Sequence, residues 1–215
     1  MGEFLTVFGE SGGEYTEKRS RFLAALRHCE TEEEAAAFLS EIRALHRDAR
    51  HNCYAYSVAG GTVKRFSDDG EPHGTAGKPI LEVIEGAGLC DIAIVVTRYF
   101  GGVLLGTGGL VRAYTEAAKE AVSGADPVRM TSCTVFRTVC SYADVDRLMQ
   151  LLRSNGCETE NTEYAEQVTV TFHLESSLAE RFQKALQETF SAKITAETVA
   201  EKMLPVKIAT DLEEF

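Results

Sequence analysis

Apolar residues along the first 125 positions alternate between the spacing of strands and that of helices. Four short apolar segments are typical of strands and lie at residues 4–8, 20–28, 52–58 and 62–66. Thr31 is followed three residues later by Glu34, which is the spacing of a capping box. Phe38, Ile42 and Leu45 then repeat at helical intervals. The pattern predicts a sheet with a helix between its second and third strands, and a polar turn between its first two.

The next segment, residues 67–123, combines turn-forming residues, a buried strand and many glycines. Residues 67–74 are rich in Asp, Gly and Pro, and a short helix with Ile80, Leu81 and Ile84 on its apolar side follows them. Residues 92–96 form a continuous apolar run, as expected of a strand covered on both faces. A glycine-rich stretch then leads into a helix whose apolar stripe consists of Leu110, Tyr114, Ala117, Ala118 and Ala121.

Residues 123–127, which read Ser-Gly-Ala-Asp-Pro, are the best candidate for a linker. Beyond them the pattern predicts strand, helix, strand, strand, helix and strand, the order of a ferredoxin-like domain. Val168, Val170 and Phe172 alternate with polar residues, which indicates a strand with one buried face. We therefore predict an α+β protein with two domains, at residues 1–126 and 129–206.

The net charge is −11, which opposes nonspecific attraction to nucleic acid but leaves room for a local basic patch. Six cysteines without C-x-x-C spacing are typical of small buried side chains in a reducing compartment. Glu3 stands where a signal peptide needs basic residues, and no apolar run approaches the ~18 residues of a membrane span. We therefore expect a cytoplasmic protein with no membrane partner.

The glycines between the buried strand and the long helix are the most unusual feature of the sequence. Glycine permits positive φ or close approach of another group, and the start of the following helix offers unpaired N–H groups. The candidate anion-binding loop consists of Gly101, Gly102, Gly106, Thr107, Gly108 and Gly109. Thr107 stands where a P-loop needs Lys, and G-x-G-x-x-G is not met. A packing loop, a contact to a phosphate backbone and a nucleotide pocket all remain open.

Basic and aromatic residues gather near these glycines in sequence. The candidate surface for RNA or a partner consists of Lys64, Arg65, Lys78, Arg98, Tyr99, Phe100, Arg112 and Lys119. Cations contact phosphates, and aromatic rings stack on bases. Lys18, Arg19 and Arg21 join this surface only if the fold brings them close. The alternative is that these are scattered surface charges and packing aromatics.

Other chemistry finds little support in the sequence. Asp68, Asp69, Glu71 and His73 are possible metal ligands, but this composition is also that of a solvated turn. His51 is two residues from Cys53, so the two share one face of a strand, yet the segment reads as an ordinary strand. Neither G-x-S-x-G nor H-E-x-x-H occurs. We predict no metal and no cofactor, and assign no reaction.

Four motifs in order resemble the IMPACT/YigZ family. They are KRSRF at residues 18–22, HNCYAY at 51–56, FSDDGEPHGTAGKPIL at 66–81, and VVTRYFGG followed by LGTGGLVRAY within 95–114. The third motif contains a loop that the resemblance marks as characteristic of the family, with Asp69, Gly70, Glu71, Pro72, Gly74 and Thr75.

The resemblance implies a fold and a field of activity. It implies that the first domain is similar to the second domain of ribosomal protein S5, a fold shared with small-molecule kinases of the GHMP type. It implies that the second domain is similar to domain V of elongation factor G. Eukaryotic members of the family regulate translation initiation, so the resemblance implies a role in translation control.

Two hypotheses follow. The first is a non-catalytic protein that binds the ribosome or structured RNA, or a protein partner in translation control, through residues 64–119. The second is a phosphometabolite- or nucleotide-binding protein or enzyme that uses the segment 106–109. The lack of a positioned general base favours binding.

Overall fold

The computed structural model describes residues 3–207 and divides into two compact units. The first consists mainly of Glu3–Arg129 and the second of Met130–Pro205. The first two residues of the expected N-terminal domain lie outside the described part. No described helix has the length and apolar character needed to cross a membrane.

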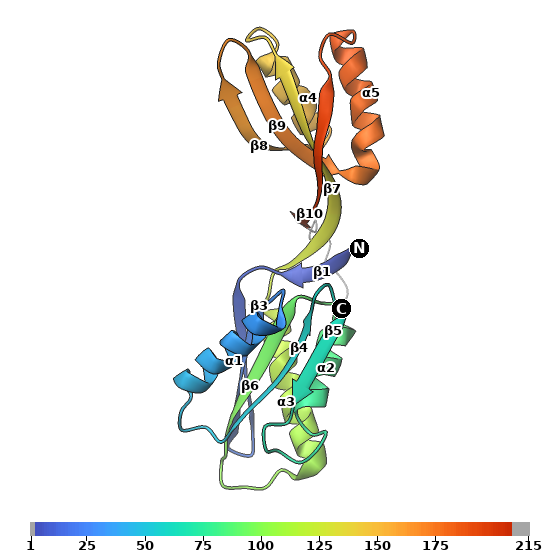
Figure 1. Cartoon of the computed structure of the whole chain (residues 1–215). Coiled ribbons are helices and arrows are strands. Elements are labelled where there is room, and N and C mark those ends of the chain that lie inside the picture. Colours follow the sequence, from blue (N-terminus) through green and yellow to red (C-terminus); the bar gives the residue numbers. More distant parts are fainter. Residues whose placement is uncertain (1–2, 208–215) are drawn as a thin grey trace. The chain divides into compact units, whose positions relative to one another are not determined.

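A five-stranded antiparallel sheet forms the centre of the first unit (Figure 1). Its strand order is β2-β3-β6-β4-β5. The strands are β2 (Glu10–Glu17), β3 (Ser20–His28), β6 (Ile92–Tyr99), β4 (His51–Val58) and β5 (Val63–Ser67), and β1 (Phe4–Val7) precedes them. The central position of β6 explains its unbroken apolar run, because both of its faces are covered.

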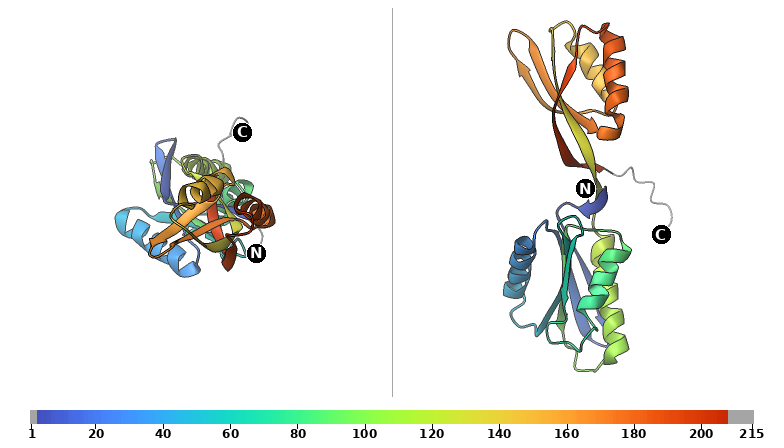
Figure 2. Two further views of the ribbon diagram at one scale, coloured as in Figure 1. Left: turned by 90° about the horizontal axis from the view of Figure 1, so that it is seen from above. Right: turned by 45° about the vertical axis from the view of Figure 1, so that its right-hand side comes forward.

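Helices cover the two faces of this sheet differently (Figure 2). Helix α1 (Glu32–Leu45) packs on one face, where Phe38 meets Ala93 and Val95 of β6. Helices α2 (Gly77–Gly86) and α3 (Gly106–Ser123) pack on the other face, against Ile94 and Val96. The expected cap of α1 is confirmed, because the Thr31 side chain accepts a hydrogen bond from the N–H of Glu34.

Strand β2 replaces the polar turn that was predicted around Gly12 and Gly13. The sequence of β2 is polar and does not show the apolar alternation of a strand, although one face of β2 packs directly on α3. A Cβ atom on Gly13 would lie 2.6 Å from the backbone nitrogen of Ala121, so only glycine fits there. The prediction of a turn was wrong, because β2 contacts α3 through backbone atoms at Gly13, and such a contact requires no apolar side chains.

The second unit has the element order strand, helix, strand, strand, helix, strand (Figure 1). The elements are β7 (Pro127–Cys140), α4 (Val145–Ser154), β8 (Glu158–Tyr164), β9 (Val168–Glu175), α5 (Ala179–Phe190) and β10 (Ala196–Lys207), with a short 3-10 helix, η1 (Ser176–Leu178), before α5. Strand β7 lies between β9 and β10, and β8 lies beside β9. The core between sheet and helices includes Phe136, Phe172, Leu148 and Phe182.

The chain passes from the first unit into the second along a strand. Helix α3 ends at Ser123, and β7 begins at Pro127, inside the range expected to be a linker. The predicted linker at residues 123–127 is therefore reduced to a short turn. Pro127 occupies the first position of the strand, where its missing N–H does least harm.

The close approach of α3 to β2 yields a first prediction. Gly13→Ala should lower the free energy of unfolding by roughly 1–3 kcal/mol, because the new methyl group overlaps backbone that cannot retreat. Gly86→Ala, at the end of α2 with open space around it, should be neutral or stabilise by up to about 1 kcal/mol. Urea unfolding of both variants checks this, and equal effects would contradict the packing described.

Candidate functional site

One end of the first sheet brings together segments that are far apart in sequence. Arg21 of β3 lies opposite Tyr99, and His51 of β4 lies opposite Arg98, so the starts of β3 and β4 flank the end of β6. The end of β5 joins them, because Ser67 lies opposite Tyr54. We call this end, formed by residues 18–22, 46–52, 67–76 and 98–112, the loop end. It is the lower end of the first unit in Figure 1.

A buried ion pair lies beneath the loop end. A guanidinium nitrogen of Arg98, Nη1, is 2.6 Å from Oε1 of Glu71, and the two side chains are only 8% and 4% exposed. The hydroxyl of Tyr114 donates to the same carboxylate oxygen at 2.9 Å, and the Cys53 thiol donates to that hydroxyl at 3.3 Å. This chain of donors joins strands β4 and β6, helix α3 and the 67–76 segment at one point.

Arg98 is therefore not the exposed phosphate contact that the sequence suggested. Its guanidinium lies 5.5 Å from the ring centroids of both Phe22 and Phe100, so it contacts two aromatic rings. Its Nε is buried with no hydrogen-bond partner among the described residues. Because a buried carboxylate needs a compensating charge, the structure assigns Arg98 to Glu71, and its role is structural.

The acidic residues of the 67–76 segment turn inward in the same way. Asp68 accepts hydrogen bonds from the N–H groups of Gly74, Ala76 and Gly77 at 2.8–3.0 Å. Burial by itself raises the pKa of the Asp68 carboxyl, but these three donors outweigh burial and hold that pKa below its usual value. The carboxylate thus fixes the segment against the start of α2.

Asp69 ties the same segment to its other neighbours. It accepts a hydrogen bond from the N–H of Asn52 at 2.7 Å and pairs with Arg43 at 2.8 Å, and its carbonyl lies 2.9 Å from Nδ1 of His51. The acidic residues weighed as metal ligands therefore have separate partners, and no group of three ligating side chains forms within residues 3–207. Within the family-motif loop, Glu71 and Thr75 are buried and Pro72 is exposed.

The glycine-rich stretch serves two distinct purposes. Gly101 packs on the β2–β3 turn: its N–H donates to Ser20 Oγ at 3.1 Å, and a Cβ atom would lie 2.1 Å from the carbonyl carbon of Arg19. Gly106, with φ of 71°, begins α3, so the segment 106–109 is the first helical turn and not a loop. This helix start has no side-chain cap and no acidic residue in its first turn, which leaves N–H groups open to an anion.

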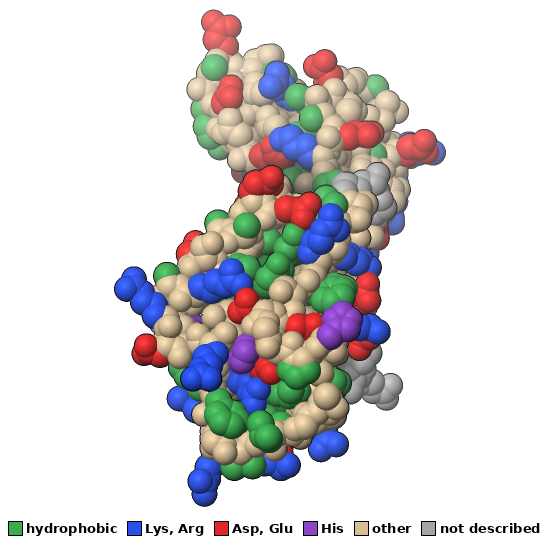
Figure 3. All heavy atoms as spheres, turned by 60° about the horizontal axis from the view of Figure 1, so that its bottom comes forward, with side chains coloured by type: hydrophobic (Ala, Val, Ile, Leu, Met, Phe, Trp, Pro, Cys, Tyr) green, Lys and Arg blue, Asp and Glu red, His purple; other side chains and the backbone are tan. Residues whose placement is uncertain are grey.

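Exposed apolar side chains occupy the β6–α3 connection. Phe100, Val103 and Leu104 are 57%, 42% and 84% exposed. Figure 3 brings the loop end forward and shows hydrophobic side chains in its middle with Lys and Arg side chains around them. Exposed and adjacent apolar groups of this kind mark interaction sites.

The cations at the loop end differ from those elsewhere in the first unit. Within residues 3–207, five exposed cations at this end form no ion pair with a carboxylate: Lys18, Arg19, Arg47, Arg50 and Arg112. Sequence reasoning included Arg112, admitted Lys18 and Arg19 only conditionally, and missed Arg47 and Arg50. The last two follow α1, and only the sheet register shows that this connection reaches the same end.

The eight residues predicted as a binding surface thus separate into three groups. Tyr99, Phe100 and Arg112 lie at the loop end, and Tyr99 is held there by a 2.9 Å hydrogen bond between its hydroxyl and Nδ1 of His46. Arg98 is buried. The other four form ion pairs at 2.7–3.8 Å: Lys64 with Glu85, Arg65 with Glu32, Lys78 with Glu82 and Lys119 with Glu116.

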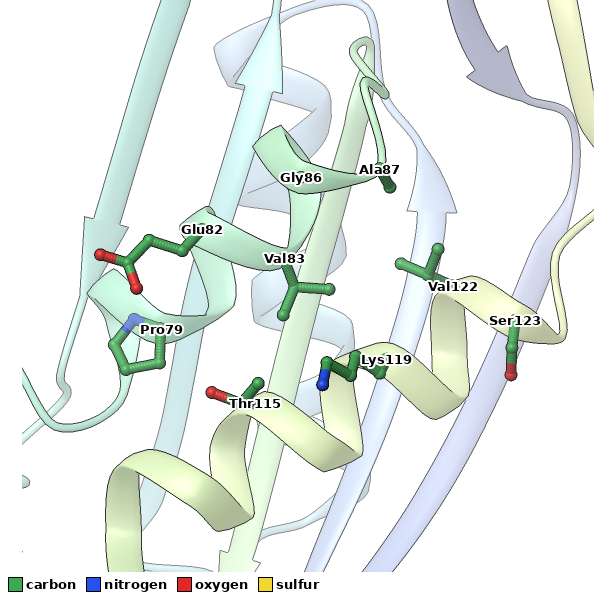
Figure 4. Close-up of a pocket in the computed structure, with 9 residues that line it drawn as sticks. All are labelled: Pro79, Glu82, Val83, Gly86, Ala87, Thr115, Lys119, Val122 and Ser123. Atoms are coloured by element: carbon green, nitrogen blue, oxygen red, sulfur yellow. The ribbon is translucent and has the colours of Figure 1, made fainter. Parts of the chain in front are cut away.

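Lys119 also lines a groove between α2 and α3 (Figure 4). The groove has a volume of about 390 Å³ and is lined by Pro79, Glu82, Val83, Gly86, Ala87, Thr115, Lys119, Val122 and Ser123. Its lining is largely apolar. Of the predicted basic residues, only Lys119 lies in its lining.

The two-residue turn between β2 and β3 is strained. Glu17 pairs with Ser20, so Lys18 and Arg19 form the whole turn, and both have positive φ, 45° and 69°. Such a turn favours Asn-Gly, because the left-handed backbone conformation is energetically unfavourable for most other residues. Lys18 and Arg19 therefore lower the stability of the turn, and strain of this kind is typical of residues that have a function.

The Cys53–His51 pair considered for catalysis does not form. The Cys53 thiol is buried against the carbonyl of Asp68 and the hydroxyl of Tyr114, and burial raises its pKa. His51 instead faces the carbonyl of Asp69. A thiol whose pKa is raised by burial is a poor nucleophile.

Comparisons with known proteins agree with these motifs. A family model for the Impact N-terminal domain matches residues 18–122, and one for a domain of unknown function, DUF1949, matches residues 138–193. An IMPACT family member of Haemophilus influenzae is 36% identical over 198 residues, 90% of this chain and 96% of that protein. The IMPACT family member YigZ of Escherichia coli is 39% identical over 175 residues, 80% and 85% of the two chains.

A solved structure described as that of a hypothetical protein is also similar. It is 35% identical with a TM-score of 0.60, over 94% of this chain and 100% of that one. The Protein IMPACT homolog of Dictyostelium discoideum is 36% identical over 101 residues, and the chain spans 29% of its length.

The buried ion pair yields a second prediction. Arg98→Met should lower the free energy of unfolding by about 3–5 kcal/mol, because it leaves the Glu71 charge buried without its cation. Lys64→Met removes an exposed partner of Glu85 and should cost no more than about 1 kcal/mol. Chemical unfolding of both variants checks this. A cost for Arg98→Met no larger than that of the control would show that the pair does not organise this end.

The Asp68 carboxylate yields a third prediction, which depends on pH. Its pKa is lower in the folded chain than its ordinary value of 3.8, so its contribution is complete above that value and is lost as the pH falls through the folded pKa. Asp68→Asn should lower the free energy of unfolding by about 1–3 kcal/mol at pH 7. The difference from the parent chain should shrink below about pH 4, measured by urea unfolding across pH. A difference independent of pH would contradict the assignment.

Proposed function

The chain belongs to the IMPACT family, and from this premise we propose that it is a non-catalytic protein that binds structured RNA of the translation machinery, the ribosome foremost, through the loop end. Regulation of translation, which the resemblance implies, is the role proposed for this binding. We also propose a cytoplasmic location, because the resemblance implies a role in translation.

One observation carries the proposal: unpaired cations surround exposed apolar side chains at one end of a chain whose net charge is −11. Of the acidic residues of this end, Asp68, Asp69 and Glu71 are engaged by N–H groups or cations of the same end, and Asp48 is exposed. The surface that remains is locally basic. Phosphate groups of RNA are the partners that such a surface attracts.

The start of α3 supports the same conclusion. Its first turn, residues 106–109, presents N–H groups without a capping side chain or a nearby carboxylate. A helix start of this kind favours a phosphate oxygen. It adds an anion contact beside the exposed apolar side chains of the β6–α3 connection.

The finer fold assignments belong to the proposal as well. We assign the first unit to the fold of the second domain of ribosomal protein S5 and the second unit to the ferredoxin-like fold. The strand order β8-β9-β7 with β10 beside β7, together with α4 and α5, supports the second assignment. Binding of a phosphometabolite at residues 106–109 is the alternative, and it has less support. His51 and Cys53 are engaged in other contacts, so neither is placed as a base.

The strained turn provides a fourth prediction, which separates stability from function. Replacing Lys18 by Asn and Arg19 by Gly together should stabilise the chain by about 1–2 kcal/mol, because the turn receives the residues it favours. The same change should weaken binding to ribosomes, and it should lower the salt slope of that binding by about 1.4–1.8. Thermal unfolding and co-sedimentation measure the two effects. Stabilisation with unchanged binding would remove the turn from the site.

A fifth prediction concerns the salt dependence of ribosome binding. If each of the five exposed cations without a described carboxylate partner contacts one phosphate, affinity should fall roughly 130- to 500-fold between 50 and 200 mM salt. Arg112→Ala should lower the slope by about 0.7–0.9. Lys119→Ala, two turns further along α3 and paired with Glu116, makes the same change in net charge and should leave the slope unaltered. Co-sedimentation across a salt series measures this, and equal effects of the two variants would contradict a localised site.

A further inference from the structure

Phe100 is an aromatic side chain held at the surface from beneath. The residue is 57% exposed, and the buried guanidinium of Arg98 lies 5.5 Å from the centroid of its ring. That guanidinium is fixed in turn by Glu71 at 2.6 Å and contacts the ring of Phe22, whose centroid is also 5.5 Å away. The ring of Phe100 therefore rests on a filled, rigid base. It forms a preorganised surface that a planar group can cover.

The Lys18-Arg19 turn lies directly beside this ring. Gly101, the next residue after Phe100, donates its N–H to Ser20, and a Cβ atom on Gly101 would overlap the backbone of Arg19. Consecutive Cα atoms are about 3.8 Å apart, so the aromatic ring and the cationic tip emerge from adjoining backbone. No described carboxylate forms an ion pair with either Lys18 or Arg19. An exposed ring beside two free cations combines the two chemistries that a nucleotide presents.

We propose that Phe100 is the stacking platform for an unpaired RNA base and that Lys18 and Arg19 hold the phosphates next to that base. This inference rests on the proposed function and makes it more specific. It names an unpaired nucleotide, in a loop, bulge or single strand, as what the loop end recognises. Bases within a duplex are stacked on each other and offer no free face, whereas unpaired bases stack on aromatic side chains.

The surrounding charges favour RNA over a protein surface as the occupant. Arg47, Arg50 and Arg112 at the same end are also exposed, and none of them forms an ion pair with a described carboxylate. RNA carries a phosphate at every nucleotide, so several unpaired cations can each meet an anion on it, whereas a protein partner would have to present a matching cluster of carboxylates. A protein partner remains one outcome of the test below.

The chain contains no tryptophan, which permits a direct test. Phe100→Trp introduces a single indole at the proposed platform. Phe8→Trp is the matched control, because Phe8 is 49% exposed and stacks on His28 at the opposite end of the sheet, where His28 lies opposite Ile92. Both variants are titrated with a short hairpin RNA that has an unpaired loop, and with a fully paired duplex of the same composition.

The expected result is quenching of the indole at position 100 by the hairpin and not by the duplex, with the control unchanged. Phe100→Leu, which keeps an apolar side chain without a ring, should weaken hairpin binding by roughly 5- to 150-fold and leave duplex binding unaltered. The Asn-Gly variant of the turn should weaken binding of both RNAs, because it removes phosphate contacts.

Three results would overturn the inference in distinguishable ways. Equal binding of hairpin and duplex, with no effect of Phe100→Leu, rejects the stacking platform while the proposed function stands. Binding to intact ribosomes but to no free RNA indicates a protein partner and rejects recognition of a nucleotide. Failure to bind either ribosomes or RNA rejects the proposed function together with the inference.

Discussion

The ion pair between Arg98 and Glu71 is the interaction on which the loop end depends. A carboxylate that is 4% exposed is tolerated only with a compensating charge and hydrogen bonds, and Arg98 and Tyr114 supply both. Because these groups come from β6, α3 and the 67–76 segment, satisfying one carboxylate fixes three parts of the chain together. The Nε of Arg98 has no hydrogen-bond partner among the described residues, because the guanidinium is positioned by Glu71 and two aromatic rings at once.

This interaction also explains how an acidic chain presents a basic surface. The carboxylates of the 67–76 segment are engaged by backbone N–H groups, by the buried Arg98 and by Arg43, so their charge is compensated within this end. Lys18, Arg19, Arg47, Arg50 and Arg112 are exposed and form no ion pair with a described carboxylate. The negative charges of the 67–76 segment are thus compensated, whereas the nearby positive charges are exposed. The net charge of the chain, −11, therefore does not describe the surface of the loop end. The same arrangement leaves Phe100 exposed above a rigid interior.

Much of the framework follows from sequence pattern alone. The capping box at Thr31, the buried run of β6 and the apolar stripe of α3 each carry a periodic signal, and each corresponds to an observed element. Strand β2 was not predicted, because its contact with α3 is made by the backbone at Gly13 and not by apolar side chains. Local pattern cannot show a contact between residues more than a hundred positions apart.

The site was predictable in location but not in the role of each residue. Arg98 was taken for a surface cation because its partner is 27 residues away. Period-two spacing gave a warning, because Arg98 falls on the same face as Ile92, Ile94 and Val96, which is a buried face. Arg47 and Arg50 lie outside any strand or helix pattern, so nothing in the sequence indicated that they belong to the loop end. Their position follows from strand register, which single-sequence patterns do not determine.

Amide hydrogen exchange with and without a hairpin RNA tests the central claim, that the loop end is the binding surface, most directly. We expect slower exchange on RNA binding in residues 18–22, 46–52, 67–76 and 98–112 together. We expect unchanged exchange along the groove between α2 and α3 and in the second unit. Protection confined to that groove or to the second unit, with no change at the loop end, would contradict the account.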